Sequence, residues 1–135
     1  MELVIGGRAQ GKLGYVLTKY PKASVMEGET PWQGEGLLAP QGPVFVVVIW
    51  NHFHLSVRAW LVEGREAAKL WDYVEAWVLS HPNAVIISDE IGCGIVPIDG
   101  GERHWREETG RLLCKIAANA TQVERVICGI PMRIK

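Results

Sequence analysis

The chain has 135 residues, the size of one domain that can bury a hydrophobic core. Hydrophobic residues make up 48% of the sequence and charged residues 21%, the balance of an ordinary globular protein. The formal net charge is −1, so composition gives no reason to expect nucleic acid or a membrane as a partner.

Cysteine content and the apolar runs bear on the compartment. Cys93, Cys114 and Cys128 are odd in number and have no paired spacing, which favours reduced thiols over a disulfide framework or a zinc site. The N-terminus lacks the basic and then apolar pattern of a signal peptide, and the longest apolar run, Val44–Trp50, is too short to cross a bilayer. We therefore expect a cytoplasmic protein.

The start of the chain carries the pattern of a phosphate-binding loop. An apolar run, Leu3–Ile5, predicts a buried strand, and a helix is expected from Gly11 to about Tyr20. Between them the sequence matches the G-x-x-x-x-G-K core of such a loop. Its candidate nucleotide-binding residues, with the position that follows, are Gly6, Gly7, Arg8, Ala9, Gln10, Gly11, Lys12 and Leu13.

The residue types suit the binding of phosphates. Glycines let the backbone curl until successive N–H groups point at an anion, and the helix N-terminus adds partial positive charge. Lys12 would reach the outer phosphates. The motif ends in Ser or Thr because that hydroxyl coordinates Mg²⁺, whereas Leu13 cannot ligate a metal, so Mg²⁺ is doubtful as a cofactor. The alternative is a glycine-rich turn without a ligand.

Strands and helices alternate along the rest of the chain. This order predicts one α/β domain over residues 1–135, with a mostly parallel sheet, helices on both faces and ligands at the carboxyl ends of the strands. Residues 27–42, rich in glycine and proline, are expected to form a long loop. Strands are expected over 23–26, 44–50, 84–88, 123–127 and 132–134, the last two around a turn at 129–131, and helices over 55–80, divided at Gly64, and 101–120.

Several charged side chains follow buried strands of this sheet. Asp89 and Glu90 form a carboxylate pair at a strand end, where either could bind Mg²⁺, accept a proton or merely cap the next segment. His52 and His54 would share one side of an extended segment. No third ligand stands at a recognised spacing, so no metal site is assigned and structural or solvent-facing histidines are favoured.

Arginines lie on the helix expected over 101–120. Arg103 and Arg106 share a face by their spacing. They could bind phosphate or simply solvate the helix, and the residues alone favour solvation.

Three segments carry a resemblance to a known family. Residues 88–97, S-D-E-I-G-C-G-I-V-P, strongly resemble the N-E-V-G-x-G-I-V-P signature of the adenosylcobinamide kinase / adenosylcobinamide-phosphate guanylyltransferase family. Residues 103–111 are similar to its R-x-F-R-D-x-x-G-R helix, and residues 126–135 to its V-x-S-G-I-P-x-x-I-K end. The start, residues 6–12, resembles its G-G-A-R-S-G-K-S loop.

The resemblance implies a RecA-like P-loop nucleotide-binding fold, ATP or GTP as ligand, and a place in corrinoid assembly. Enzymes of this family phosphorylate adenosylcobinamide with ATP or GTP, transfer GMP from GTP through a guanylylated histidine, and are typically trimers. Carried onto this chain, it makes Lys12 and Glu90, or Asp89 as the other acid, catalytic. Gly92, Gly94 and Arg106 would shape the nucleotide or corrinoid edge.

The chain departs from the family pattern at positions that handle charge. Residues 21–42, where the family carries its GMP-accepting histidine, contain none, and Leu13 replaces the motif hydroxyl. The acid expected near the end of the 44–50 strand is missing, with Trp50 close to its place, and Leu113-Cys114 replace Asn-Gln. Such groups are worth about two or more powers of ten in rate. We therefore expect no guanylyltransferase step; a non-catalytic nucleotide-binding or regulatory derivative is the alternative reading.

Overall fold

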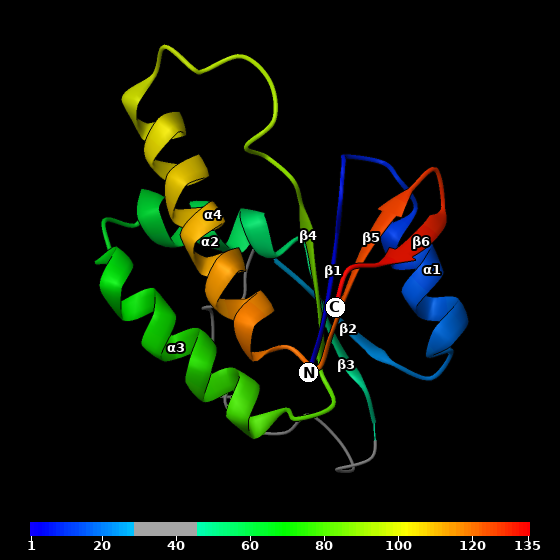
Figure 1. Cartoon of the computed structure of the whole chain (residues 1–135). Coiled ribbons are helices and arrows are strands. Elements are labelled where there is room, and N and C mark those ends of the chain that lie inside the picture. The colour runs from blue at the N-terminus through cyan, green and yellow to red at the C-terminus, as the bar shows by residue number, and fades with distance from the viewer. Residues whose placement is uncertain (29–45) are drawn as a thin grey trace.

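A six-stranded sheet forms the centre of the part of the chain that the computed structural model describes, residues 1–28 and 46–135 (Figure 1). The strand order is β2-β3-β4-β1-β5-β6, and all neighbouring pairs are parallel except β5 with β6. The strands are β1 (Glu2–Gly6), β2 (Ser24–Glu27), β3 (Val48–Asn51), β4 (Val85–Asp89), β5 (Gln122–Ile127) and β6 (Ile130–Arg133).

Helices cover both faces of this sheet. In Figure 1, α2, α3 and α4 lie on one side of the strands and α1 on the other. Two clusters of buried residues fill the spaces between sheet and helices, which is why the central strands are apolar on both faces. The helices are α1 (Lys12–Lys19), α2 (Phe53–Val62), α3 (Ala67–Ser80) and α4 (Gly100–Asn119).

The larger core cluster is centred on Trp50, at the carboxyl end of β3. Its ring is completely buried and lies edge-on to Phe53 and to Trp77, with ring centroids 5.1 Å and 4.8 Å away. The indole Nε1 donates a 2.8 Å hydrogen bond to Ser56 Oγ. One side chain thus ties β3 to the first turn of α2 and to α3.

The α/β class and the mostly parallel sheet are confirmed, and so is the division of the long helical region, where Gly64 has a φ of +71°. Both predicted ends of the 44–50 strand are wrong. β3 begins at Val48 rather than Val44 and extends to Asn51. Residues 29–42 of the predicted loop, and 44–45 of the predicted strand, lie outside the described residues.

The turn predicted at 129–131 is also displaced. Cys128 and Gly129 make the turn, with φ of +50° and +78°, and Ile130 already belongs to β6. A two-residue hairpin loop of this kind requires positive φ at both positions, which matches the right-handed twist of the flanking strands. None of the helices in residues 1–28 and 46–135 has the length and apolarity to cross a membrane.

Replacement of Trp50 by alanine is expected to lower the free energy of unfolding by about 3–5 kcal/mol, because it empties the centre of the larger core. Urea unfolding followed by circular dichroism measures the loss. The matched control is Leu79→Ala on α3, since Leu79 is 77% exposed and its removal should change stability by no more than about 0.5 kcal/mol. A Trp50→Ala variant as stable as the control contradicts this account of the core.

Candidate functional site

The segment between β1 and α1, residues 7–11, is a tight loop attached to the β5–β6 hairpin. Gly6 permits close approach of the strands, since a Cβ there would lie 2.4 Å from the Val126 carbonyl oxygen. The Gln10 carbonyl accepts a 2.9 Å hydrogen bond from the Gly129 N–H, and Gln10 Oε1 accepts one of 2.6 Å from the Cys128 N–H. Gly11, with a φ of +81°, turns the chain into α1. The hairpin thus holds the loop in a defined position at the start of the helix.

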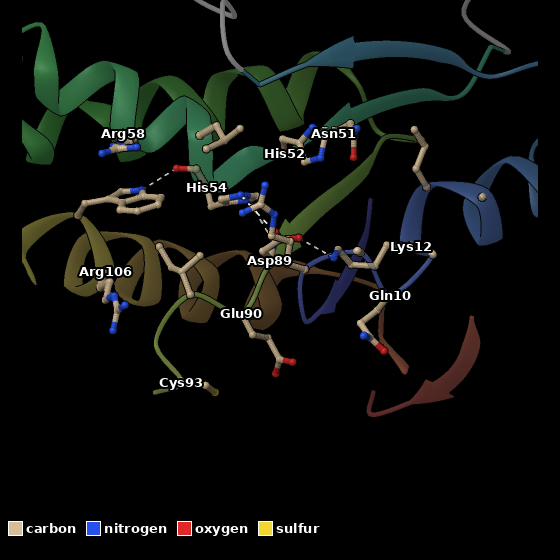
Figure 2. Close-up of a pocket in the computed structure, with 18 residues that line it drawn as sticks. Gln10, Lys12, Asn51, His52, His54, Arg58, Asp89, Glu90, Cys93 and Arg106 are labelled. Carbon is tan, nitrogen blue, oxygen red and sulfur yellow. Dashed lines mark hydrogen bonds and ion pairs between the residues drawn. The ribbon is translucent and has the colours of Figure 1, made fainter. Parts of the chain in front are cut away.

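Lys12, the first residue of α1, is turned inward and is only 7% exposed. Its Nζ donates to the carbonyl oxygens of Gly6 and Gly7, at 3.2 Å and 2.7 Å. It also forms an ion pair of 2.5 Å with Asp89 Oδ1 at the end of β4 (Figure 2). An ammonium group has three N–H donors, so each has a partner within the chain.

The second oxygen of Asp89 faces a histidine. His54 Nε2 lies 3.5 Å from Asp89 Oδ2, and His54 Nδ1 accepts a 3.1 Å hydrogen bond from the Asp89 backbone N–H. Because Nδ1 is the acceptor, the proton of the neutral ring is on Nε2, toward the carboxylate. Trp105 stacks on the imidazole and donates from Nε1 to the His54 carbonyl oxygen at 2.7 Å. The ring is therefore fixed in place and in tautomer.

Burial lowers the pKa of His54 to about 4, although the Asp89 carboxylate acts in the opposite direction. Desolvation of the imidazolium is the largest cause, and the positive charges of Lys12 and Arg8 add to it. At neutral pH the side chain is uncharged, and its Nε2 faces Asp89 Oδ2.

The two histidines do not share one side of an extended segment, as the sequence analysis expected. His52 has a φ of +52° and ends the strand, so the chain turns at once into α2. The two rings meet edge to face, 5.8 Å apart. His52 Nδ1 lies 2.9 Å from Glu27 Oε2, and Asn51 Nδ2 also donates to that carboxylate. Hydrogen bonding to Asn51 and His52 lowers the pKa of Glu27, although burial acts in the opposite direction and is the larger single effect.

Lys12, Asn51, His52, His54 and Asp89 border one cavity of about 870 Å³, at the edge of the sheet where β1, β3 and β4 end (Figure 2). Of the candidate residues named from the sequence, eight line this cavity: Arg8, Ala9, Gln10, Gly11, Lys12, Leu13, Glu90 and Arg106. Gly6, Gly7, Gly92 and Gly94 do not line it; the chain between β4 and α4 contributes Ile91 and Cys93 instead.

The two predicted acids differ in their surroundings. Asp89 contacts Lys12, whereas Glu90 forms a 3.0 Å ion pair with Arg125 Nε, and its side chain points away from the lysine in Figure 2. Asp89 is therefore the carboxylate next to the loop lysine. Successive residues of a strand point to opposite faces, which separates the pair.

The sequence analysis did not identify the residues at the end of the cavity farthest from the 7–11 loop. Leu55 and Arg58 on α2 line it together with Trp105 on α4. The Arg58 guanidinium lies 5.0 Å from the Trp105 ring centroid and 2.5 Å from Glu102 Oε1. Helical spacing of His54 with Arg58 was the available signal, but it required the start of α2 to be known.

No group of three or more His, Cys, Asp or Glu side chains within residues 1–28 and 46–135 is arranged to hold a metal ion. Asp89 Oδ1 is ion-paired with Lys12, and the Asn51 side-chain amide donates a hydrogen bond to Glu27.

The fold and the site define an α/β protein whose cavity lies at the carboxyl ends of parallel strands, where ligands of such sheets bind. A family model described as "Cobinamide kinase / cobinamide phosphate guanyltransferase" matches residues 43–134. The bifunctional adenosylcobalamin biosynthesis protein CobU of Escherichia coli K12 is 41% identical over 68 residues, 50% of this chain and 38% of that protein. Its counterpart in Salmonella typhimurium LT2 is 41% identical over 51 residues, 38% of this chain and 28% of the relative.

The chain belongs to the cobinamide kinase / cobinamide phosphate guanyltransferase family of cobalamin biosynthesis. The resemblance found in the sequence is thereby confirmed. The matches span 38% and 28% of the lengths of these two relatives. The family match contains His54 and Asp89 but begins after the 7–11 loop.

The lowered pKa of His54 predicts a loss of stability in mild acid. Unperturbed histidine takes up a proton near pH 6.5, whereas folded His54 resists protonation until pH falls to about 4. The unfolded chain therefore binds more protons between these values, so the stabilising contribution is complete above pH 6.5 and is lost as pH falls toward 4. Its size is on the order of 3 kcal/mol.

Urea midpoints of the wild type and of His54→Gln, measured from neutral pH down to about pH 4.5, isolate this contribution. The variant should show a flatter decline than the wild type over that range. His104→Gln, at an exposed position of α4, is the matched control and should follow the wild type. Equal slopes for His54→Gln and the wild type would show that the ring is not held neutral.

Proposed function

We propose that this chain binds a nucleoside triphosphate, ATP or GTP, in the cavity and acts as an adenosylcobinamide kinase-type transferase of a RecA-like P-loop fold. The observation that supports this most directly is the pairing of Lys12, at the start of α1, with an acid at the end of the neighbouring strand. The cavity volume of about 870 Å³ lies in the range of small-molecule sites, ~300–1,000 Å³.

The phosphates would lie against the 7–11 loop. The backbone N–H groups there and the N-terminal end of α1 favour an anion, and Lys12 supplies a full positive charge. Arg8 and Arg106 line the same cavity. The nucleoside or the corrinoid edge would occupy the end formed by Arg58 and Trp105.

Catalysis would be an in-line transfer of the terminal phosphoryl group, stabilised by positive charge near the moving oxygens. The residues present do not fit a Mg²⁺ ion held by the protein. Leu13 occupies the position of the motif hydroxyl, and Trp50, where the family has an acid, is buried in the core. We therefore assign charge stabilisation to Lys12 and the nearby arginines.

A second candidate function is nucleotide binding without turnover, as in a regulatory derivative of the family. Leu13 and the internal pairing of Lys12 favour it, because both reduce the groups available for phosphoryl transfer. This function requires that the affinity for nucleotide be the same with and without Mg²⁺. It also requires that no phosphorylated cobinamide form during incubation with ATP or GTP. The family resemblance further suggests a homo-oligomer, which sedimentation would test.

Replacement of Lys12 by methionine is expected to weaken ATP or GTP binding by about 10- to 100-fold, the worth of a charged hydrogen bond to phosphate. Isothermal titration with and without Mg²⁺ measures it. Lys19→Met on the same helix is the matched control, since Lys19 pairs with Glu2, away from the cavity. No binding of either nucleotide by the wild type, with or without cobinamide, would overturn the proposal.

Neither His52 nor His54 is expected to become guanylylated. His54 has no lone pair to offer, because Nδ1 accepts the Asp89 N–H and Nε2 carries its proton toward Asp89. His52 is 45% exposed and pairs with Glu27, so an adduct there would be open to water. Intact-mass spectrometry after GTP treatment should show no added GMP. An adduct mapped to either histidine would restore the transferase step.

A further inference from the structure

Each N–H donor of the Lys12 ammonium group already has a partner in this structure. Its three donors are taken by the Gly6 and Gly7 carbonyls and by Asp89 Oδ1. Lys12 is 7% exposed and the Asp89 side chain 14%, so little water can replace either partner. An incoming phosphate can bind the ammonium only by displacing one of these partners, and the carboxylate is the one that competes as an anion.

Asp89 would remain in position if Lys12 left it. Its second oxygen faces the Nε2 proton of His54, and its backbone N–H holds the other nitrogen of the same ring. Trp105 fixes that ring by stacking and by a hydrogen bond to the His54 carbonyl. The released oxygen, Oδ1, is therefore the one left facing the cavity that Asp89 lines.

We propose that phosphate exchanges for Asp89 on Lys12, and that the released carboxylate, held by His54, accepts the proton of the hydroxyl that receives the phosphoryl group. This inference rests on the proposed function. The acceptor oxygen forms a bond to the terminal phosphorus, the bond from that phosphorus to the bridging oxygen breaks, and the nucleoside diphosphate leaves. The hydroxyl proton passes to Asp89 Oδ1, and Lys12 stays with the phosphates.

If this exchange takes place, Lys12 and Asp89 have opposite effects on the affinity for polyphosphate. Lys12 attracts the polyphosphate, whereas Asp89 competes for Lys12 and repels the same anion. In phosphoryl transfer, by contrast, both groups increase the rate. A carboxylate that served only to hold the fold would not separate binding from turnover in this way.

The test is Asp89→Asn, which keeps the shape and removes the charge and the basicity. Tripolyphosphate should bind about tenfold more tightly to the variant than to the wild type, because the competing charge is gone. Transfer of phosphate from ATP or GTP to cobinamide should fall by about 10²-fold or more, the usual worth of a positioned base. Glu107→Gln is the matched control, since Glu107 pairs with Arg111 on the exposed side of α4 and should change neither quantity.

A second pair of variants addresses His54. Replacement by alanine should slow transfer while leaving tripolyphosphate affinity near the wild-type value, because the histidine acts through Asp89. Glutamine, whose amide can donate to Asp89 Oδ2, should restore part of the rate. Thermal melts of each variant identify those that fold.

Equal tripolyphosphate affinity of Asp89→Asn and the wild type, or no binding by either, would overturn the exchange. A variant that transfers phosphate at the wild-type rate would overturn the role as proton acceptor. If the wild type binds nucleotide and phosphorylates no cobinamide, the proposed function fails and the proton-accepting step fails with it. The tripolyphosphate comparison still decides the exchange in that case.

Discussion

The buried ion pair between Lys12 and Asp89 is the constraint on which the site depends. A charged lysine that is nearly out of water is tolerated only when it is paired and hydrogen-bonded. Here the pair joins the first residue of α1 to the last residue of β4, segments far apart in sequence. Loss of either partner would leave an uncompensated charge, so the geometry of the 7–11 loop and of the β4 end are linked.

Sheet topology brings the two residues together. β1 and β4 are adjacent and parallel, and their register pairs Gly6 with Asp89. The Glu90 N–H donates to the Gly6 carbonyl oxygen at 3.0 Å, which extends the pairing past the strand ends. The chain leaves β1 toward α1 and leaves β4 toward α4 at the same edge, so a loop lysine and a strand-end acid meet without any long side-chain reach.

Whether a feature depends on local sequence or on sheet topology decides whether it could be predicted from the sequence alone. Continuous apolar runs and glycine-rich junctions predict strands, helices and the edge at which ligands bind, because burial and turn geometry are local properties. The choice between Asp89 and Glu90 is not local: one step along the chain turns the side chain to the other side, and only the fold decides which of the two meets Lys12. His54 was missed as a partner of Asp89 because His52 adopts a left-handed conformation and starts a helix where an extended segment was expected.

The position of Trp50 shows how the charge arrangement of this chain differs from the family pattern read in its sequence. An acid at the end of β3 would be two strands from β1, and at a strand spacing of about 4.8 Å it would suit a cation between itself and the phosphates. Trp50 instead fills the core with Phe53 and Trp77. The acid of this site stands on β4, one strand closer to Lys12, where it contacts the ammonium directly. A carboxylate in contact with the lysine neutralises its charge, so the phosphate binding that we propose would begin with the separation of two protein charges.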